Sequence, residues 1–230
     1  MERVWYAAYG SNLSRARFET YLSGGRPAGG TRIYPGARDH TPPADQRALL
    51  LPGQLYFAWE SATWTGGVAF YDPTGPTDGV AARAYLLTVQ QFSDVAAQEM
   101  HRLPGTKGAD LDVHSLLRHA RSVTLGDGRY ETLHRVGTIQ DLPVVTFSAS
   151  WTAASAPLNS PSAAYLRMIA SGLQDAHLWS AQQICDYLLT APGVTDSWDR
   201  SDLAQLITRG QLSRRACCQR PPTTCGGISS

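Results

Sequence analysis

The chain has 230 residues, of which 43% are hydrophobic and 17% are charged. This composition is typical of a globular protein with one sizeable core, and it excludes a chain that is mainly disordered. Twenty basic and nineteen acidic residues leave a formal net charge of +1. Because so small a charge creates no long-range field, we expect neither nucleic acid nor a membrane surface as a partner.

The cellular location and the cofactors are predicted from two motifs that the sequence lacks. The first five residues lack the basic start and the apolar stretch of a signal peptide, so we expect a cytoplasmic protein. The cysteines lack the C-x-x-C spacing of a zinc site, so we expect reduced thiols, no metal and no cofactor; they are Cys185, Cys217, Cys218 and Cys225. The near-zero net charge permits self-association, and a homodimer is one expectation.

The amino-terminal segment predicts a strand, a tight loop and a helix, in that order. Residues 4–9 are aromatic or small and read as a buried strand that stops at Gly10. The loop 10–13 follows, and Ser14 is a plausible N-cap for a helix that ends before Gly24.

The middle of the chain predicts a sheet. Short strand signals alternate with Gly and Pro punctuation, which favours an antiparallel or mixed sheet closed into a small barrel. A helix with Glu99 on its apolar face is expected over 89–100, and another over 112–119. The expected strands are 31–34, 48–51, 55–59, 67–71, 80–88, 130–136 and 143–149.

The carboxyl-terminal part changes to helical patterns. A helix is expected from Pro161 through Leu173, and a second helix is expected to start at a capping box formed by Ser180 and Gln183. We predict one domain over 1–195, a last helix within 196–210 that Gly210 closes, and a disordered tail over 211–230.

Two features of the sequence could carry chemistry. The loop after the first strand combines Gly10, Ser11 and Asn12 where a helix begins, which favours a small carboxylate over a phosphate because the second Gly and the Lys of a P-loop are missing. Glu99 is the only glutamate in an apolar helical neighbourhood, where a partly buried carboxyl group is suited to move protons. An ordinary strand-to-helix turn and a solvated helix end are the alternative interpretations of these features.

Four stretches in order resemble the gamma-glutamylcyclotransferase-like family. Tyr9-Gly10-Ser11-Asn12-Leu13 resembles its Y-G-S-N-L signature, and the stretch from Asp94 to Glu99 resembles the one that ends in its catalytic glutamate. The run 128–130 resembles its G-x-Y, and the run from Pro161 to Gly172 resembles its P-S-x-x-Y-x-x-x-I-x-x-G helix.

This resemblance implies an α+β fold, a small mixed β-barrel flanked by helices, and an enzyme that acts on a small gamma-glutamyl molecule. The implied reaction is intramolecular aminolysis, which releases 5-oxoproline and a free amine without an enzyme nucleophile. It also implies that Glu99 is the catalytic base and acid. The implied substrate-binding residues are Tyr9, Gly10, Ser11, Asn12, Leu13 and Tyr130.

Two other hypotheses remain open. Met100 stands where family members commonly have Gly, and an insert over 101–129 separates Glu99 from Tyr130. Both departures favour a non-catalytic ligand-binding or interaction module on the same fold. A related amide cyclase that acts on a gamma-glutamyl intermediate is the second alternative. The leaving group is not defined by the sequence.

Overall fold

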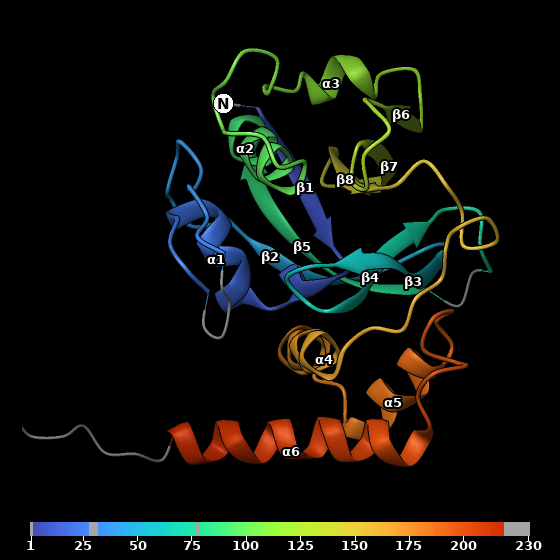
Figure 1. Cartoon of the computed structure of the whole chain (residues 1–230). Helices are drawn as coiled ribbons and strands as arrows, with labels where there is room; N and C mark the ends of the chain where they lie inside the picture. The colour runs from blue at the N-terminus through green and yellow to red at the C-terminus, as the bar shows by residue number, and fades with distance from the viewer. Residues whose placement is uncertain (1, 28–31, 77–78, 219–230) are drawn as a thin grey trace, which may run out of the picture.

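A six-stranded mixed sheet organises the protein (Figure 1). The computed structural model describes residues 2–27, 32–76 and 79–218. β1 pairs with β8 in parallel, and the other neighbours in this sheet are antiparallel. Its order is β2 (Gln46–Leu51), β5 (Val80–Thr88), β1 (Arg3–Ala8), β8 (Leu142–Ser148), β7 (Thr132–Ile139) and β6 (Ser122–Thr124). A second sheet contains β3 (Gln54–Ser61) and β4 (Gly66–Asp72).

The central strand β1 is buried on both faces because its side chains alternate between two hydrophobic clusters. Trp5 and Ala7 belong to a cluster that includes residues of β3, β4 and the carboxyl-terminal helices. Val4, Tyr6 and Ala8 belong to the cluster that includes residues of the first two helices. This arrangement explains why the strand reads as a continuous apolar run instead of an alternating one.

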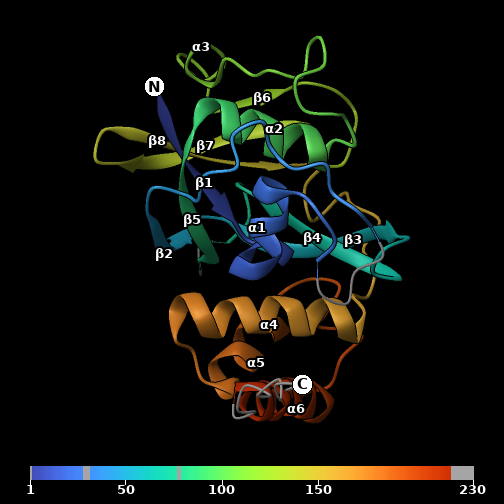
Figure 2. The same cartoon turned by 90° about the vertical axis from the view of Figure 1, so that its left-hand side faces the viewer.

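Helices cover the sheet in two groups. Figures 1 and 2 show α4 beneath the strands, with α5 and α6 beyond it, whereas α3 lies at the opposite end of the molecule. The helices are α1 (Arg15–Ser23), α2 (Val89–Glu99), α3 (Val113–Leu116), α4 (Ala163–His177), α5 (Ala181–Leu189) and α6 (Arg200–Cys218), and a 3-10 turn, η1 (Ser11–Leu13), precedes α1. No helix among the described residues has the length and apolar content needed to cross a bilayer.

The predicted α+β class agrees with these elements, but a closed barrel is not found in the described part of the chain. Side-chain hydroxyls join the two sheets instead of a strand ladder. The Ser148 hydroxyl accepts from the N–H of Tyr71 at 3.0 Å and donates to its carbonyl at 2.7 Å. The Ser148 side chain therefore satisfies both main-chain groups of one β4 residue.

The helix α2 is fixed at both of its ends. At the start, Thr88 and Gln91 form a reciprocal capping box, with both hydrogen bonds at 3.1 Å. Near the end, the fully buried Gln98 amide donates to the Tyr21 carbonyl of α1 at 2.9 Å and accepts from the N–H of Gly36 at 3.3 Å. The last residue of the helix, Glu99, therefore has a well-defined position.

The structure confirms one predicted helix start and differs from the prediction in several other elements. The capping box of Ser180 and Gln183 is confirmed, but Ser14 occupies the N-cap of α1 without a side-chain hydrogen bond. In the predicted strand 31–34, Tyr34 makes only an isolated bridge with Gly25, and residue 31 lies outside the described residues. The last helix continues past Gly210 to Cys218, so the predicted tail over 211–230 is wrong for 211–218, and 219–230 lies outside the described residues.

Close contact between α4 and η1 predicts a stability effect for Gly172→Ala. A Cβ atom at this position would lie 2.4 Å from the Leu13 Cβ and 2.6 Å from the Leu13 carbonyl carbon. We expect the free energy of unfolding to fall by about 1–3 kcal/mol, because overpacking forces the backbone to shift. Urea denaturation measures the change.

Gly210→Ala in α6 is the matched control, because among the described residues no atom outside the neighbouring backbone of the helix lies within 4 Å of the added Cβ. This variant should gain about 0.5–1 kcal/mol from helix propensity. Equal stability of the two variants would show that the contact between α4 and η1 is not tight.

Candidate active site

A small cavity of about 40 Å³ lies where β1 ends and η1 begins. Residues from five parts of the chain meet there: the end of β1 with the following loop, β4, the end of α2, the segment around β7 and β8, and α4. The lining residues are Tyr6, Tyr9, Gly10, Ser11, Asn12, Ala69, Glu99, Tyr130, Phe147 and Tyr165. Glu99 is the one charged side chain among them. We call this cavity the inner cavity.

The loop that borders the inner cavity is a tight 3-10 turn. The N–H of Leu13 donates to the Gly10 carbonyl at 3.0 Å, and the Asn12 carbonyl accepts from the Tyr85 hydroxyl at 2.9 Å. Leu13 itself is fully buried in the core and does not line the cavity. The structure therefore gives no support to Leu13 as a substrate-binding residue, because its side chain packs inward and its N–H already has an acceptor.

Glu99 and Asn12 form the central contact of the site. The Asn12 amide nitrogen donates to the Glu99 Oε1 at 3.0 Å and lies 3.4 Å from the Tyr6 hydroxyl oxygen. Asn12 is only 4% exposed, and its Oδ1 is buried without a hydrogen-bond partner among the described residues. Since buried polar atoms are rarely left unpaired, this oxygen is an acceptor that a ligand could satisfy.

Two of the cavity phenols already donate their protons inside the protein. The Tyr9 hydroxyl donates to the Phe147 carbonyl at 2.8 Å, and the Tyr130 hydroxyl donates to the Ala69 carbonyl at 3.1 Å. Burial raises the pKa of both phenols well above the ordinary value, so both stay protonated at neutral pH. Tyr130 therefore lines the cavity as expected, but its proton is engaged by β4.

Tyr6 and Tyr165 differ from the other two phenols because their hydroxyl oxygens accept hydrogen bonds from protein N–H groups. The Tyr165 oxygen accepts from the N–H of Ala69 at 3.1 Å. Burial raises the pKa of Tyr165 to about 12, against the opposing effect of hydrogen bonds from the N–H groups of Ala69 and Ser11. Burial and then the Glu99 charge raise the pKa of Tyr6. No described residue accepts the proton of either hydroxyl, so both are free to donate to a ligand.

A second, wider cavity of about 140 Å³ adjoins the first and shares Ser11, Glu99, Tyr130 and Tyr165 with it. We call it the outer cavity. Three arginines line it, namely Arg17, Arg32 and Arg129, together with His101 and Trp64. Glu99 therefore lies at the boundary between a cavity that is rich in phenols and a cavity that is rich in guanidinium groups.

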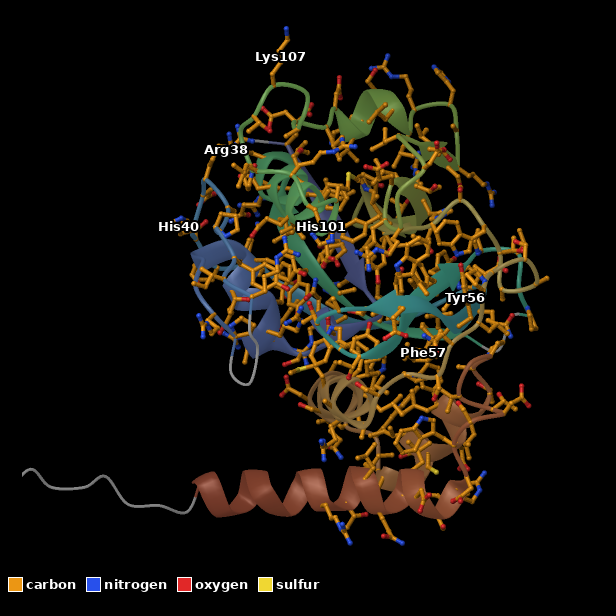
Figure 3. All side chains as sticks on the ribbon, in the orientation of Figure 1. Arg38, His40, Tyr56, Phe57, His101 and Lys107 are labelled. Atoms are coloured by element: carbon orange, nitrogen blue, oxygen red, sulfur yellow. The ribbon has the colours of Figure 1, made fainter. Side chains whose placement is uncertain are left out.

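The two ends of the 101–129 insert contribute to the outer cavity. His101 follows α2 after Met100, and Figure 3 shows it nearer the middle of the molecule than Arg38. At the other end of the insert, the Arg129 guanidinium lies 3.0 Å from the His101 Nε2. Burial, Arg32 and Arg129 all lower the pKa of His101, so this imidazole is neutral at pH 7 and can accept from Arg129.

Other candidate chemistries find little support among the described residues. No group of three or more His, Cys, Asp or Glu side chains is arranged to hold a metal ion there. The Ser122 hydroxyl lies 2.8 Å from the His134 Nδ1, but Nε2 of this imidazole is buried and unpaired. Burial lowers the pKa of His134 to about 4, against the opposing effect of Asp72. No described carboxylate is hydrogen-bonded to Nε2, so the pair lacks the orienting partner of a hydrolase triad.

The structure brings six of the seven predicted site residues to one cavity, and Leu13 is not among the residues that line it. Sequence reasoning missed Tyr6, Tyr165 and the arginines of the outer cavity. Tyr165 belongs to the P-S-x-x-Y run that carries the family resemblance, which was a usable signal. The arginines carry no local signal, because they meet only after the chain has folded.

Comparisons with known proteins give distant likenesses. No family model matches the sequence. The chain is 28% identical over 205 residues to histone deacetylase 5 of Arabidopsis thaliana, a match that covers 80% of this chain but only 30% of that protein. The deacetylation that this name describes belongs to that protein.

Solved structures similar to this chain include a gamma-glutamyl cyclotransferase, at 16% identity and a TM-score of 0.46, which covers 99% of this chain and 94% of the other. They also include an uncharacterized protein from Homo sapiens, at 20% identity and a TM-score of 0.47, which covers 80% of this chain and 85% of the other. Because both TM-scores lie below 0.5, we base the assignment of function on the residues of the two cavities.

Proposed function

We propose that the protein is an amide-cleaving cyclase that converts a gamma-glutamyl amide or peptide to 5-oxoproline and a free amine. The single observation that supports this proposal most strongly is the Asn12–Glu99 pair at 3.0 Å in the wall of the inner cavity. A lone carboxylate with an adjacent unpaired acceptor suits a substrate that arrives with an ammonium group.

The α-amine of the substrate would bind between two oxygens. Glu99 offers a carboxylate oxygen, and Asn12 offers its buried and unpaired Oδ1. An ammonium group that donates to both oxygens satisfies the orphaned acceptor and stays in hydrogen-bond contact with the base. Asn12 acts here as a positioning residue, because its amide nitrogen holds the carboxylate.

The reaction needs no second nucleophile, because the attacking amine and the amide carbonyl belong to one molecule. Glu99 takes a proton from the ammonium group, and the amine nitrogen then forms a bond to the γ-carbonyl carbon. The former amide C–N bond breaks, and the proton held by Glu99 passes to the leaving nitrogen. The ring nitrogen also gives up its second proton, which the released amine takes up as it becomes an ammonium ion. The carboxylate is regenerated, so one group acts as base and then as acid.

Negative charge develops on the γ-carbonyl oxygen during the attack. The sequence favours main-chain N–H groups of the loop as donors to this oxygen, but the N–H of Leu13 is engaged and the N–H of Ser11 is directed to Tyr165. We therefore assign the donor role to the Tyr165 hydroxyl. A fixed donor aimed at a developing oxyanion is typically a major part of catalysis.

Product analysis with gamma-glutamyl compounds tests the proposal. The purified chain should release 5-oxoproline and an equal amount of free amine from at least one member of a panel of gamma-glutamyl amino acids, peptides and amines. N-acetylated versions of the same compounds are the matched control, because they lack the attacking amine and should give no product.

Two results would contradict the proposal. Absence of 5-oxoproline from every compound would favour the binding-module alternative, for which Met100 and the insert are the motivating features. Cleavage of the N-acetylated compounds would indicate hydrolysis by water.

A further inference from the structure

A surface cavity of about 490 Å³ lies between the insert and β7. Residues 117–121, which connect α3 to β6, line one side of it, and residues 135–138 of β7 line the other. Figures 1 and 2 show α3, β6 and β7 at the end of the molecule opposite α6. This cavity shares no lining residue with the inner or the outer cavity, so the proposed reaction does not use it. We call it the edge cavity.

Three arginines line the edge cavity, and its lining residues include no carboxylate. Arg118, Arg121 and Arg135 are all exposed, and none of them forms an ion pair with a carboxylate among the described residues. The formal net charge of the whole chain is only +1, so this gathering of positive charge is a local feature. It favours an anionic ligand at this place.

Two of the three arginines lie directly opposite each other on neighbouring backbone segments. The β6–β7 ladder pairs Ser122 with His134, and it continues by one more pair because the N–H of Arg135 donates to the Arg121 carbonyl at 2.7 Å. Residues opposite each other in an antiparallel pair share a face, and like charges in this arrangement are destabilising. The fold therefore holds two guanidinium groups in an unfavourable position, and an anion bound between them would remove the repulsion.

The protein itself occupies few of the N–H donors of these arginines. The Arg135 guanidinium donates to the Thr138 hydroxyl at 3.4 Å, which is a long contact. The side chains of Arg118 and Arg121 form no hydrogen bond within the part of the chain that the structure describes. Because a guanidinium has five N–H donors, each of the three can bind oxygens of a ligand in the edge cavity.

We infer that the edge cavity binds a small molecule that carries two linked phosphate groups. A guanidinium binds phosphate oxygens through paired N–H groups, and one phosphate group carries a charge of about −1.5 to −2 at pH 7. Two linked groups therefore match three arginines better than one group does. The volume of about 490 Å³ suits a small ligand, since such sites usually measure roughly 300–1,000 Å³.

The phosphate groups themselves are the part of the ligand that is recognised. No phenylalanine, tyrosine or tryptophan is among the lining residues, so the cavity has no aromatic platform on which a nucleobase could stack. This inference does not depend on the proposed function, because the edge cavity is separate from both cavities of the candidate active site.

Calorimetric titration of the full chain with inorganic pyrophosphate tests the inference. Citrate is the comparison ligand at equal ionic strength, because it is also multiply charged but carries carboxylates instead of phosphates. Pyrophosphate should bind at one site and about tenfold more tightly than citrate, the factor expected for one additional charge-assisted hydrogen bond. The double variant Arg121→Gln, Arg135→Gln should bind pyrophosphate at least about tenfold more weakly than the unmodified chain.

The unfolding temperature gives a second readout on the same variant. Without ligand and at low ionic strength, the double variant should unfold about 1–3 °C above the unmodified chain, because two opposed like charges have been removed. Pyrophosphate should raise the unfolding temperature of the unmodified chain and leave that of the double variant unchanged. A merely structural role for the two arginines would give the opposite sign in the absence of ligand.

The double variant Arg3→Gln, Arg26→Gln is the matched control. It removes the same amount of charge, and both residues are exposed and lie outside the edge, inner and outer cavities. This variant should keep its affinity for pyrophosphate. If Arg121→Gln, Arg135→Gln does not fold, each single variant should show part of the loss in affinity. Equal affinity for citrate, an equal loss in the control, or pyrophosphate binding that survives without Arg121 and Arg135 would each overturn the inference.

Discussion

Glu99→Gln is expected to lower kcat for 5-oxoproline release by at least about 10²-fold, the loss typical of a removed acid–base group. The amide keeps the size of the carboxylate, and its oxygen can still accept from the Asn12 nitrogen that lies 3.0 Å from the Glu99 oxygen. The cavity should therefore keep its shape while the substrate ammonium loses its proton acceptor. Steady-state kinetics with the best gamma-glutamyl substrate measures the effect.

Glu19→Gln is the control for charge, because Glu19 is exposed on α1 and its ion pair within the described part of the chain is with Arg15 at 2.8 Å. The unfolding temperature and ligand affinity of Glu99→Gln should remain close to those of the unmodified chain. Full activity in Glu99→Gln would show that another group moves the protons, and an equal loss in Glu19→Gln would point to a general effect of charge.

Tyr165→Phe is expected to lower kcat by about 10²-fold with a small change in KM, because a donor to the developing oxyanion acts mainly in the transition state. The same change leaves the N–H of Ala69 without its acceptor at 3.1 Å. We therefore also expect a loss of about 1–3 kcal/mol in the free energy of unfolding. Kinetics below the unfolding transition separate the two effects.

Tyr187→Phe provides the matched comparison. The Tyr187 hydroxyl accepts from the N–H of Ala81 at 3.1 Å, as Tyr165 does from Ala69, but it lies outside both cavities. This variant should lose comparable stability and keep its kcat. If both phenylalanine variants had the same kcat, the Tyr165 hydroxyl would have a purely structural role.

Local patterns in the sequence predict much of this fold. The strand, loop and helix at the amino terminus, the helix that ends at Glu99 and the capping box at Ser180 depend on neighbouring residues, and the structure contains all of them. The short strand β6 was missed because it has only three residues, and its partner β7 is what defines it. The end of the last helix was also missed, because Gly210 does not stop it.

The site was less predictable than the fold. Residues near the two motifs could be named from the sequence, and the structure places most of them around one cavity. The direction of each hydroxyl proton could not be predicted, since it depends on partners such as the carbonyl of Ala69 and the N–H of the same residue. For this reason the donor role is now proposed for Tyr165, whereas sequence reasoning favoured the main-chain N–H groups of the loop 10–13.

The two ends of the insert over 101–129 meet in the outer cavity. His101 begins the insert and Arg129 ends it, and their side chains lie 3.0 Å apart. The length of the insert between these two residues can therefore change in evolution while both residues stay in the outer cavity. The groups proposed for bond making lie on other segments of the chain. Changes within the insert alone could therefore alter the range of substrates, while the residues proposed for catalysis stay the same.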